Sequence, residues 1–295
     1  MKVIQYNIYF GNHKEFDIDD RIENICNIII NTNPDVICLQ EVTREKYDMI
    51  KYCLIYHYPY SYPHNITFTY GSVIISKYKI ELAVTHSYEM TQMGRDIKIV
   101  LVTDNNDNMF YICTTHFESE FKTVKNKIYQ YKRCSDILYQ MYIKTKIPII
   151  LCADTNVCKL TEYSFYGAFT NAIGWKDTWI ETGSQPELEI TFNTETNPIL
   201  IEKYQNNRII KSRLDRILHI SDLYCNMFQM IGINNDIITS DHYGLVASFV
   251  NEKPDNYRAY IPLYISPLER IKDKELNSRE KFIQKRYKKR ILALI

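Results

Sequence analysis

The sequence predicts an α/β protein in which two mixed β-sheets pack face to face, with helices on the outside. Near the N-terminus, apolar runs at residues 3–8 and 36–39 are separated by a helical pattern, as in a parallel strand–helix–strand unit. Residues 71–114 instead hold several short strand patterns without helices between them, which is typical of antiparallel strands. A long helical pattern then precedes a further buried strand at 149–152. Helical crossovers and antiparallel meanders in one chain favour two mixed sheets.

The first part of the chain alternates strands and helices. The strand at residues 3–8 is followed by a helix that Asn33-Pro34 ends. Four residues at helical spacing define the buried face of this helix: Ile22, Ile25, Cys26 and Ile29. Residues 36–39 form the second buried strand, after which Thr43 can cap another helix. The apolar side of that helix holds Tyr47, Ile50 and Leu54.

The rest of the chain adds a meander, one long helix and three strands. The short strands of the meander are expected at residues 71–75, 80–85, 97–102 and 109–114. The buried stripe of the long helix is predicted from Val124, Ile128, Tyr131, Leu138 and Met141. Pro148 precedes the most apolar strand, at 149–152, and the last two strands are expected at 213–220 and 243–250.

Residues 1–250 are predicted to form one catalytic domain, because no repeat or linker interrupts them. Residues 251–295 form a basic C-terminal extension that is expected to be helical. Within it, residues 269–290 hold ten Lys and Arg against four acidic residues. This basic run is either a solvated helix or an accessory helix that contacts nucleic-acid phosphate.

Composition excludes several classes of protein. The net charge is +1, so any phosphate binding must come from local basic groups. The eight cysteines show no Cys-x-x-Cys spacing, which disfavours a zinc site and suits a reducing compartment. No signal peptide is evident, and the longest apolar stretch, at residues 147–153, is too short to cross a bilayer. We therefore expect an intracellular protein, nuclear or cytoplasmic, that is not secreted and has no membrane partner.

Polar clusters follow the predicted strands, at the point where each strand ends or the next begins. They are Asn7, Gln40-Glu41, residues 115–119, residues 153–156, Arg213-Leu214-Asp215 and residues 240–245. Strand ends of this kind build the active sites of α/β proteins. The chain has no Gly-x-Ser-x-Gly elbow, Walker loop or Gly-x-Gly-x-x-Gly motif, which disfavours a serine hydrolase, an NTPase or a dinucleotide enzyme. The pattern that remains favours metal-assisted hydrolysis of a phosphoester.

Each carboxylate has an ordinary structural interpretation beside the catalytic one. Asp154 could take a proton from water while Asn156 orients that water, or the two could form only an Asx turn after a strand. Glu41 could bind Mg²⁺ or Mn²⁺, or it could be the N-terminal glutamate of the helix that Thr43 begins. A single one of these residues would not decide between the interpretations.

Two of the seven histidines lie in a catalytic context. His116 directly follows a strand, and His242 follows Asp241. Asp215 could hold the imidazole of His242 in one tautomer and keep it protonated. A protonated histidine can stabilise a phosphoryl transition state. The other five histidines are expected to be surface or core residues.

As a set, and in this order, the clusters resemble the endonuclease/exonuclease/phosphatase superfamily, whose fold is a four-layered α/β sandwich. The resemblance runs from Asn7 to about Val250, and within it the chain is most similar to the 5′-tyrosyl-DNA phosphodiesterases. Residues 116–119 resemble the His-Leu-Glu-Ser segment of that branch, and residues 154–156 match its Asp-Thr-Asn. Residues 240–245 resemble its Ser-Asp-His-Trp-Gly-Leu, where many other relatives have proline in place of Gly244.

The resemblance implies roles for the residues around the scissile bond. Asp154 would activate or position the attacking water, and Asn7 and Asn156 would orient phosphate and water. Glu41 would be the main ligand of Mg²⁺, with Mn²⁺ as the alternative ion, and Asp241 would help to complete the metal shell.

The resemblance also implies contacts to the substrate. His116 and His242 would contact non-bridging phosphate oxygens, with Asp215 supporting His242. The residues expected to bind the rest of the substrate are Arg95, Phe192 and Ser119.

The implied reaction is Mg²⁺-dependent hydrolysis of the 5′-phosphotyrosyl bond between a protein tyrosine and DNA, with RNA as an alternative, leaving a 5′-phosphate. A tyrosine phenolate has a conjugate-acid pKa of about 10, so it leaves with little help from a general acid. The chain departs from the family pattern at Tyr9, where an acidic residue is usual, and at Ala153, Phe192 and Asn193. The alternatives are an abasic-site endonuclease, a deadenylase, a small-molecule phosphatase, and a binding protein that kept only the fold.

Overall fold

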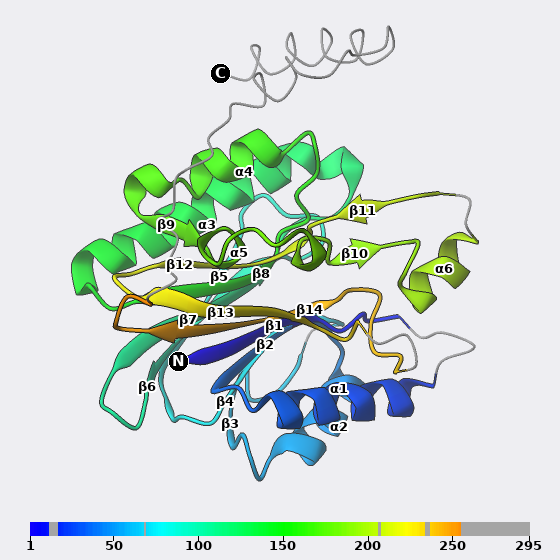
Figure 1. Cartoon of the computed structure of the whole chain (residues 1–295), viewed down its shortest axis with the longest axis horizontal. Coiled ribbons are helices and arrows are strands. Elements are labelled where there is room, and N and C mark those ends of the chain that lie inside the picture. The colour runs from blue at the N-terminus through cyan, green and yellow to red at the C-terminus, as the bar shows by residue number, and fades with distance from the viewer. Residues whose placement is uncertain (12–16, 68, 206–207, 234–236, 255–295) are drawn as a thin grey trace, which may run out of the picture. The chain divides into compact units, whose positions relative to one another are not determined.

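Two six-stranded mixed sheets lie between layers of helices in the computed structural model of the chain (Figure 1). The structure describes residues 1–11, 17–67, 69–205, 208–233 and 237–254. The first sheet consists, in spatial order, of β13 (Tyr224–Ile231), β14 (Gly244–Val250), β1 (Lys2–Asn7), β2 (Val36–Val42), β4 (Gly71–Ser76) and β3 (Tyr60–Tyr62). The second consists of β5 (Ile80–Ser87), β6 (Asp96–Thr103), β7 (Met109–His116), β8 (Ile149–Asp154), β12 (Asp215–Ile220) and β9 (Trp175–Asp177).

Helices cover the outer face of each sheet. The first sheet carries α1 (Ile18–Thr32) and α2 (Arg44–Leu54), which lie on one side of the sandwich in Figure 1. The second carries α3 (Val124–Thr145) and α4 (Glu162–Ala168) on the opposite side. The alternation of side chains along each strand explains the layers, because Val3 packs between the sheets whereas Ile4 packs under the first pair of helices. The predicted α/β sandwich with two mixed sheets is confirmed.

The helix ends follow the predicted local signals. The side chain of Asp17 accepts a hydrogen bond from the backbone N–H of Asp19 at the start of α1, and Asn33 ends that helix in the left-handed conformation. The hydroxyl of Thr43 accepts from the backbone N–H of Lys46 and so caps α2. Helix α3 buries Tyr131 and Leu138 as predicted, whereas Val124, Ile128 and Met141 of the predicted stripe are only half-buried. Its buried face instead includes polar side chains such as Lys127 and Gln130.

Strand register brings distant polar residues to one edge of the sandwich. Parallel pairing of β1 and β2 sets Asn7 beside Gln40, and parallel pairing of β7 and β8 sets His116 beside Asp154. Antiparallel pairing of β8 and β12 places Asp215 on the other side of Asp154.

Several elements were not expected from the sequence. They are β3, β9, β13, the two-stranded β10 (Phe192–Asn193) and β11 (Lys211–Ser212), α4, α5 (Thr178–Glu181), α6 (Pro198–Tyr204) and the short 3-10 helices Phe121–Thr123, Asn171–Ile173 and Pro186–Leu188. Most are short, and β13 is an edge strand with a register shift between Cys225 and Met227, which breaks the alternation that reveals a strand.

The described residues belong to one compact unit, residues 1–260. The predicted helical extension lies almost wholly outside the described residues, and the boundary at residue 250 stays a prediction. Within the described part of the chain, no helix is both long and apolar enough to cross a membrane.

Candidate active site

Asp154, the last residue of β8, is buried at the centre of the polar cluster. Its Oδ1 accepts from the backbone N–H of Asn156 at 3.1 Å, which is the Asx turn of the structural interpretation. Its Oδ2 accepts from Asn7 Nδ2 at 2.9 Å and lies 3.2 Å from His116 Nε2. The turn and the polar cluster therefore use different oxygens of one carboxylate. The Asx turn is present, and the catalytic role of Asp154 stays a prediction.

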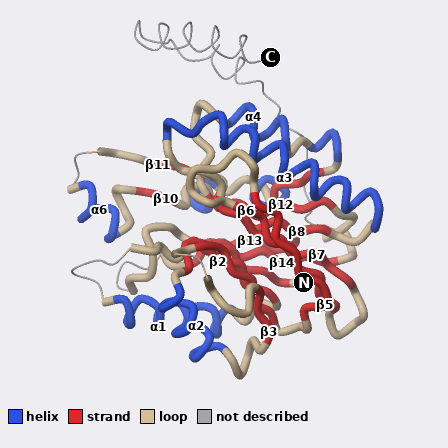
Figure 2. Tube along the Cα trace, turned by 180° about the vertical axis from the view of Figure 1, so that it is seen from behind, coloured by secondary structure: helices blue, strands red, loops and turns tan. Residues whose placement is uncertain are grey.

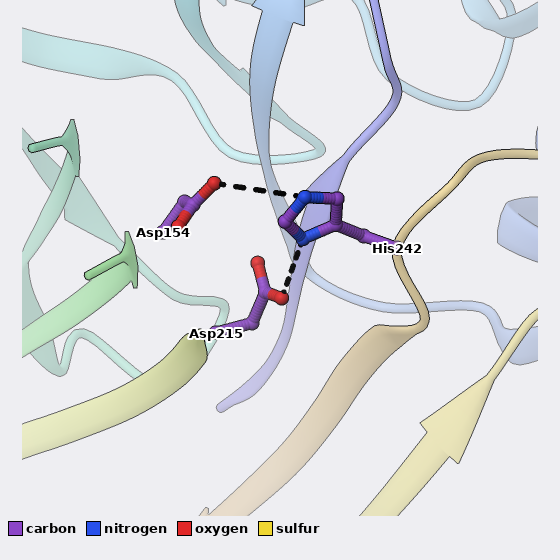
Figure 3. Close-up of side chains that lie close together, drawn as sticks. All are labelled: Asp154, Asp215 and His242. Atoms are coloured by element: carbon purple, nitrogen blue, oxygen red, sulfur yellow. Dashed lines mark hydrogen bonds and ion pairs between the residues drawn. The ribbon is translucent and has the colours of Figure 1, made fainter. Parts of the chain in front are cut away.

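His242 faces Asp154 from the loop before β14 (Figure 3). Its Nδ1 lies 2.8 Å from Asp215 Oδ2, and its Nε2 lies 4.0 Å from Asp154 Oδ2. Burial alone would lower the pKa of His242, but the carboxylate of Asp215, helped by those of Asp154 and Asp241, outweighs it and raises that pKa well above the ordinary value. The imidazole is therefore cationic at neutral pH, with one N–H pointing toward the cluster.

The pKa of Asp154 is raised as well, but for a carboxyl group this rise disfavours the charged form. Burial, together with the charge of Asp215, raises the pKa of Asp154 from 3.8 to about 7. A carboxylate with such a pKa can take up a proton near neutral pH, as a general base must.

His116 has a different charge state from His242. Burial, followed by the positive charges of Arg95 and His242, lowers the pKa of His116 well below its ordinary value. Arg95 Nη1 lies 3.1 Å from His116 Nδ1 and Arg95 Nη2 lies 3.3 Å from His116 Nε2, and a neutral ring accepts at only one of these nitrogens. We assign the ring proton to Nε2, because the carboxylate oxygen of Asp154 that lies 3.2 Å from it acts as an acceptor. The neutral ring donates a hydrogen bond without adding charge.

Glu41 lies at the end of β2, in a left-handed backbone conformation with φ 59°. Its Oε1 accepts from Asn7 Nδ2 at 3.1 Å and its Oε2 from the backbone N–H of Phe10 at 2.9 Å. Because Thr43 supplies the cap of α2, Glu41 is not needed at the helix terminus. Asn7 bonds to both Glu41 and Asp154 and thus links the two carboxylates.

Asp241 is buried close to these groups. Burial and the negative charge of Glu41 raise its pKa, although the charge of His242 opposes them. Its Oδ1 has no hydrogen-bond partner in the described part of the chain, and its Oδ2 lies 3.8 Å from Lys203 Nζ on α6. Lys203 also lies over the ring of Tyr9, which stands where the family pattern has an acid.

Asn156 adopts a left-handed backbone conformation with φ 46° just after β8. Its Nδ2 donates to the carbonyl oxygen of Phe117 at 3.1 Å, and its own carbonyl accepts from the buried Lys127 at 3.0 Å. These contacts fix the turn that carries Asp154.

The three residues predicted to bind the rest of the substrate have different positions. Arg95 is buried against His116, and a small cavity of about 60 Å³ lies between these two residues and Tyr70. The ring of Phe192 meets that of His242 edge to face, with centroids 5.2 Å apart. Ser119 is exposed, and its hydroxyl contacts the sulfur of Met93 at 3.3 Å; Met93 in turn contacts Arg95 and lines the same small cavity, and the role of Ser119 stays a prediction.

A model of the endonuclease/exonuclease/phosphatase family matches residues 4–242, a span that contains all of these side chains. The chain belongs to this family.

Curated proteins that are similar to this chain in sequence match it at low identity. Tyrosyl-DNA phosphodiesterase 2 of Danio rerio is 22% identical over 261 residues, which are 84% of this chain and 66% of that protein. The Xenopus tropicalis protein of the same name is 24% identical over 244 residues, 80% of this chain and 62% of its own length. The matches thus span slightly less than two thirds of these relatives.

Solved structures agree on the fold. Truncated TDP2 of Caenorhabditis elegans superimposes with a TM-score of 0.73 at 22% identity, covering 84% of this chain and 96% of that one. TDP2 of Danio rerio complexed with a single-strand DNA product gives 0.72 at 22% identity, covering 85% and 98%.

The acidic residues of this family member fit a hard divalent cation. Glu41, Asp154 and Asp241 offer carboxylate oxygens, and the buried Oδ1 of Asp241 lacks a hydrogen-bond donor among the described residues. Mg²⁺ prefers such oxygen ligands. Among the described residues, the one group of three or more whose ligand atoms all lie within 4.8 Å of one another is Asp154, Asp215 and His242, and Glu41, Asp154 and Asp241 do not meet that spacing together. However, a protonated His242 has no lone pair to offer a metal ion. This favours Glu41 and Asp241, which lie outside that trio, as the metal ligands.

Sequence reasoning missed several residues that support the cluster. Gln5 Nε2 donates to Asp215 Oδ1 at 2.9 Å, and Gln40 Nε2 donates to Thr114 Oγ1 at 2.9 Å, so two glutamines of the first sheet join it to the second under the site. Thr191 Oγ1 accepts from the backbone N–H groups of Leu214 and Asp215, both at 3.1 Å. A glutamine inside an otherwise apolar strand is the signal that could have found Gln5, whereas Gln40 was noted beside Glu41 without a role.

Proposed function

We propose that this chain is a Mg²⁺-dependent phosphodiesterase that hydrolyses the 5′-phosphotyrosyl bond between a protein tyrosine and DNA. The observation that carries the proposal is the arrangement around Asp154 Oδ2. This oxygen accepts from Asn7, lies 3.2 Å from His116 Nε2 and faces the cationic His242 at 4.0 Å. In-line attack of water on phosphorus requires a base for the water, together with positive charge or N–H donors for the phosphoryl oxygens. All of these groups converge around this oxygen.

Asp154 acts as the base in this proposal. Its carboxylate takes one proton from a water molecule while the water oxygen bonds to phosphorus. Asn7 holds the carboxylate in place, and the turn at Asn156 fixes the other oxygen, so only Oδ2 faces the reacting water.

His242 and His116 stabilise the negative charge that develops on the phosphoryl oxygens. The imidazolium of His242 donates from Nε2 and is held by Asp215 through Nδ1. His116 donates a neutral N–H, and the adjacent guanidinium of Arg95 supplies positive charge beside it.

The leaving group needs little assistance. The bond from phosphorus to the tyrosyl oxygen breaks as water attacks, and the phenolate departs and takes a proton from solvent. Because its conjugate acid has a pKa of about 10, the phenolate is a far better leaving group than an alkoxide. A 5′-phosphate remains on the nucleic acid.

Glu41 and Asp241 would hold the metal ion, Mg²⁺ or alternatively Mn²⁺. When bound, the ion would neutralise charge on the phosphate and lower the pKa of Asp154 and Asp241. This assignment is tested by Mn²⁺ binding measured by electron paramagnetic resonance. Glu41→Gln should weaken binding by about tenfold or more, whereas Asp215→Asn, which changes the ion pair with His242, should weaken it less. The reverse order would assign the ion to the Asp154, Asp215 and His242 trio.

The preference for a tyrosyl adduct on DNA, with RNA as the alternative, is supported by the relatives named tyrosyl-DNA phosphodiesterase 2. The aromatic ring of Phe192 beside His242 offers a surface against which a nucleotide base or an aryl group can pack. The eight free cysteines suit a reducing compartment, nuclear or cytoplasmic.

A panel of substrates tests the proposal. Single-stranded 5′-phosphotyrosyl DNA and RNA, an abasic duplex, poly(A) and p-nitrophenyl phosphate should be compared with Mg²⁺ and then with EDTA. We expect tyrosine release from the phosphotyrosyl DNA, dependent on the metal and faster than cleavage of the other substrates. Cleavage of another member of the panel without tyrosine release would show a different phosphoesterase of the same family.

A further inference from the structure

A buried carboxylate lies close to the candidate active site, in the segment that follows β7. Glu118 is two residues beyond His116 and has no exposed surface. Its Oε1 accepts three hydrogen bonds, from the hydroxyl of Thr91 at 2.8 Å and from the backbone N–H groups of Gln92 at 2.6 Å and Met93 at 3.1 Å. Because the side chain is fully buried, any role of Glu118 must be exerted through these contacts within the protein.

The three donors belong to one loop, residues 88–95, which joins β5 to β6. The loop ends in Arg95, whose backbone N–H donates to the hydroxyl of Thr91 at 2.8 Å. Because this hydroxyl also donates to Glu118, it links the carboxylate to the backbone of Arg95 by two consecutive hydrogen bonds. The guanidinium of Arg95 in turn lies against the ring of His116, with Nη1 3.1 Å from Nδ1.

Helix α3 holds the same loop through Gln130, a polar side chain of its buried face. Nε2 of Gln130 donates to the carbonyl oxygen of Met90 at 2.8 Å, and its Oε1 accepts from the backbone N–H of Glu118 at 2.9 Å. Seen from behind in Figure 2, α3 covers the sheet of β7 and β8 on the side opposite to α1 and α2. Glu118 and Gln130 thus fix residues 90–93 to the second sheet and its helix.

Glu118 binds the loop as a charged acceptor. Burial alone would raise the pKa of Glu118, but the hydrogen bonds from the loop and the positive charge of Arg95 outweigh it and lower that pKa. Hydrogen bonds to a charged acceptor are stronger than those to a neutral one. Oε2 has no hydrogen-bond partner among the described residues, so the oxygen that faces the loop makes all of the hydrogen bonds described for this carboxylate.

The end of this loop forms part of the active-site surface. Met93, Gly94 and Arg95 line the cavity of about 60 Å³ beside His116. Gly94 has φ 66°, in the left-handed region that favours glycine, so the backbone turns directly before Arg95. A displacement of about 1 Å at a group that acts on the reacting centre can lower the rate by about a hundredfold. The position of Arg95 therefore depends on what holds the loop.

We propose that Glu118 is a positioning residue, which fixes residues 91–93 so that Arg95 stays against His116 and supplies positive charge for the substrate phosphate. This role rests on the proposed function in one respect, because Arg95 must act on the substrate for its position to matter. Glu118 itself touches no reacting atom. If Glu118 instead served only the stability of the fold, the effect of its loss on the reaction would not depend on Arg95.

Amide hydrogen exchange of the full chain, measured by NMR without substrate, tests whether Glu118 holds the loop. Glu118→Gln keeps the shape of the side chain but loses the charged acceptor. We expect the backbone N–H groups of Gln92, Met93 and Arg95 to exchange at least about tenfold faster, whereas those of β8 should change less. Glu120→Gln, at an exposed acid two residues along the chain, should leave the exchange of the loop unchanged. Unchanged exchange of the loop in Glu118→Gln would overturn the proposal.

A double-mutant cycle in kcat/KM tests whether Glu118 acts through Arg95. Glu118→Gln should lower kcat/KM for a single-stranded 5′-phosphotyrosyl oligonucleotide by at least about fivefold, but by less than about twofold in the Arg95→Ala background. Equal factors in the two backgrounds would overturn the proposal. If the wild type releases no tyrosine but cleaves another substrate of the panel, the cycle is measured on that substrate, so that failure of the proposed function is distinguished from failure of this role.

Thr91 offers a second pair of variants that keeps the test decisive if Glu118→Gln does not fold. Thr91 is only half-buried, and Thr91→Val removes the hydroxyl that links Glu118 to Arg95 while keeping the shape of the side chain. Thr91→Ser keeps the hydroxyl. We expect faster exchange of the Arg95 N–H and a lower kcat/KM in Thr91→Val, with values close to the wild type in Thr91→Ser. Equal behaviour of these two variants would contradict the role of Glu118.

Discussion

The two carboxylate oxygens of Asp154 have different hydrogen-bond partners. Burial and the negative charge of Asp215 raise the pKa of this carboxyl group. That pKa is about 7 in the folded chain against 3.8 for an ordinary aspartate. Between these values the unfolded chain has released the proton while the folded chain still holds it. Folding is therefore favoured at low pH, and this contribution to stability is lost as the pH rises toward 7.

The pH dependence of stability that Asp154 causes leads to a prediction for Asp154→Asn in the presence of EDTA. Asparagine cannot ionise, so the variant lacks the loss of stability that the wild type undergoes between about pH 4 and 7. The free energy of unfolding of the variant minus that of the wild type should therefore increase with pH, by at most about 1.4 kcal/mol per pH unit. Urea unfolding at several pH values measures it. A difference that does not change with pH would mean that Asp154 ionises normally.

Asp215 keeps His242 protonated through the 2.8 Å contact at Nδ1. With Asp215→Asn, the pKa of His242 should fall, and the alkaline limb of the pH–rate profile should move to lower pH. We also expect the maximal rate to drop by about a hundredfold, the usual scale for a lost proton-transfer or charge-stabilising group. Glu187→Gln, at an exposed position, is the control. An unmoved alkaline limb would remove His242 from the role of cationic donor.

At the scale of elements, α1 ties two loops of the active site together through one side chain. Arg21 is buried and donates to the carbonyl oxygens of Ile8 at 2.9 Å, Gly11 at 3.1 Å and Thr239 at 2.8 Å. Ile8 follows β1, and Thr239 lies shortly before the loop that carries His242. The helix thus fixes the two chain segments that bring Asn7 and His242 to the cluster.

Replacing this arginine tests the role of the helix. Arg21→Lys keeps the charge but loses the planar fork, so at least one buried carbonyl is left without a donor. We expect the free energy of unfolding to fall by about 1–3 kcal/mol. Arg44→Lys, at an exposed position at the start of α2, should change it by less than about 0.5 kcal/mol. Equal effects of the two changes in urea unfolding would contradict this role.

Some strands of the two sheets could be predicted from the sequence and others could not. Strands β1, β2, β7 and β8 are strongly apolar and end in polar residues, so both the strands and their terminal side chains were evident. Strand β13 was not, because polar residues such as Asn226 and Gln229 and a bulge interrupt its pattern. Lys127 was missed for a different reason, since only the tertiary structure buries its ammonium group against the carbonyl of Asn156.

At the scale of the whole molecule, the proposed catalytic groups all lie in the compact unit formed by residues 1–260. We therefore expect a chain that ends at Tyr260 to keep the kcat/KM of the full chain for a short phosphotyrosyl oligonucleotide. The comparison should be made with both proteins shown to be folded by circular dichroism. Loss of activity in a folded truncated chain would show that residues 261–295 contribute to catalysis.

The central claim is that Asp154 activates water for attack on a 5′-phosphotyrosyl bond. The most direct measurement is the rate of tyrosine release from a single-stranded 5′-phosphotyrosyl oligonucleotide with Mg²⁺, for the wild type and for Asp154→Asn. We predict release with a 5′-phosphate product for the wild type, and a rate about 10²- to 10⁴-fold lower for the variant, whose fold is retained. Equal rates, or no release by a wild-type chain that cleaves another phosphoester, would contradict the account.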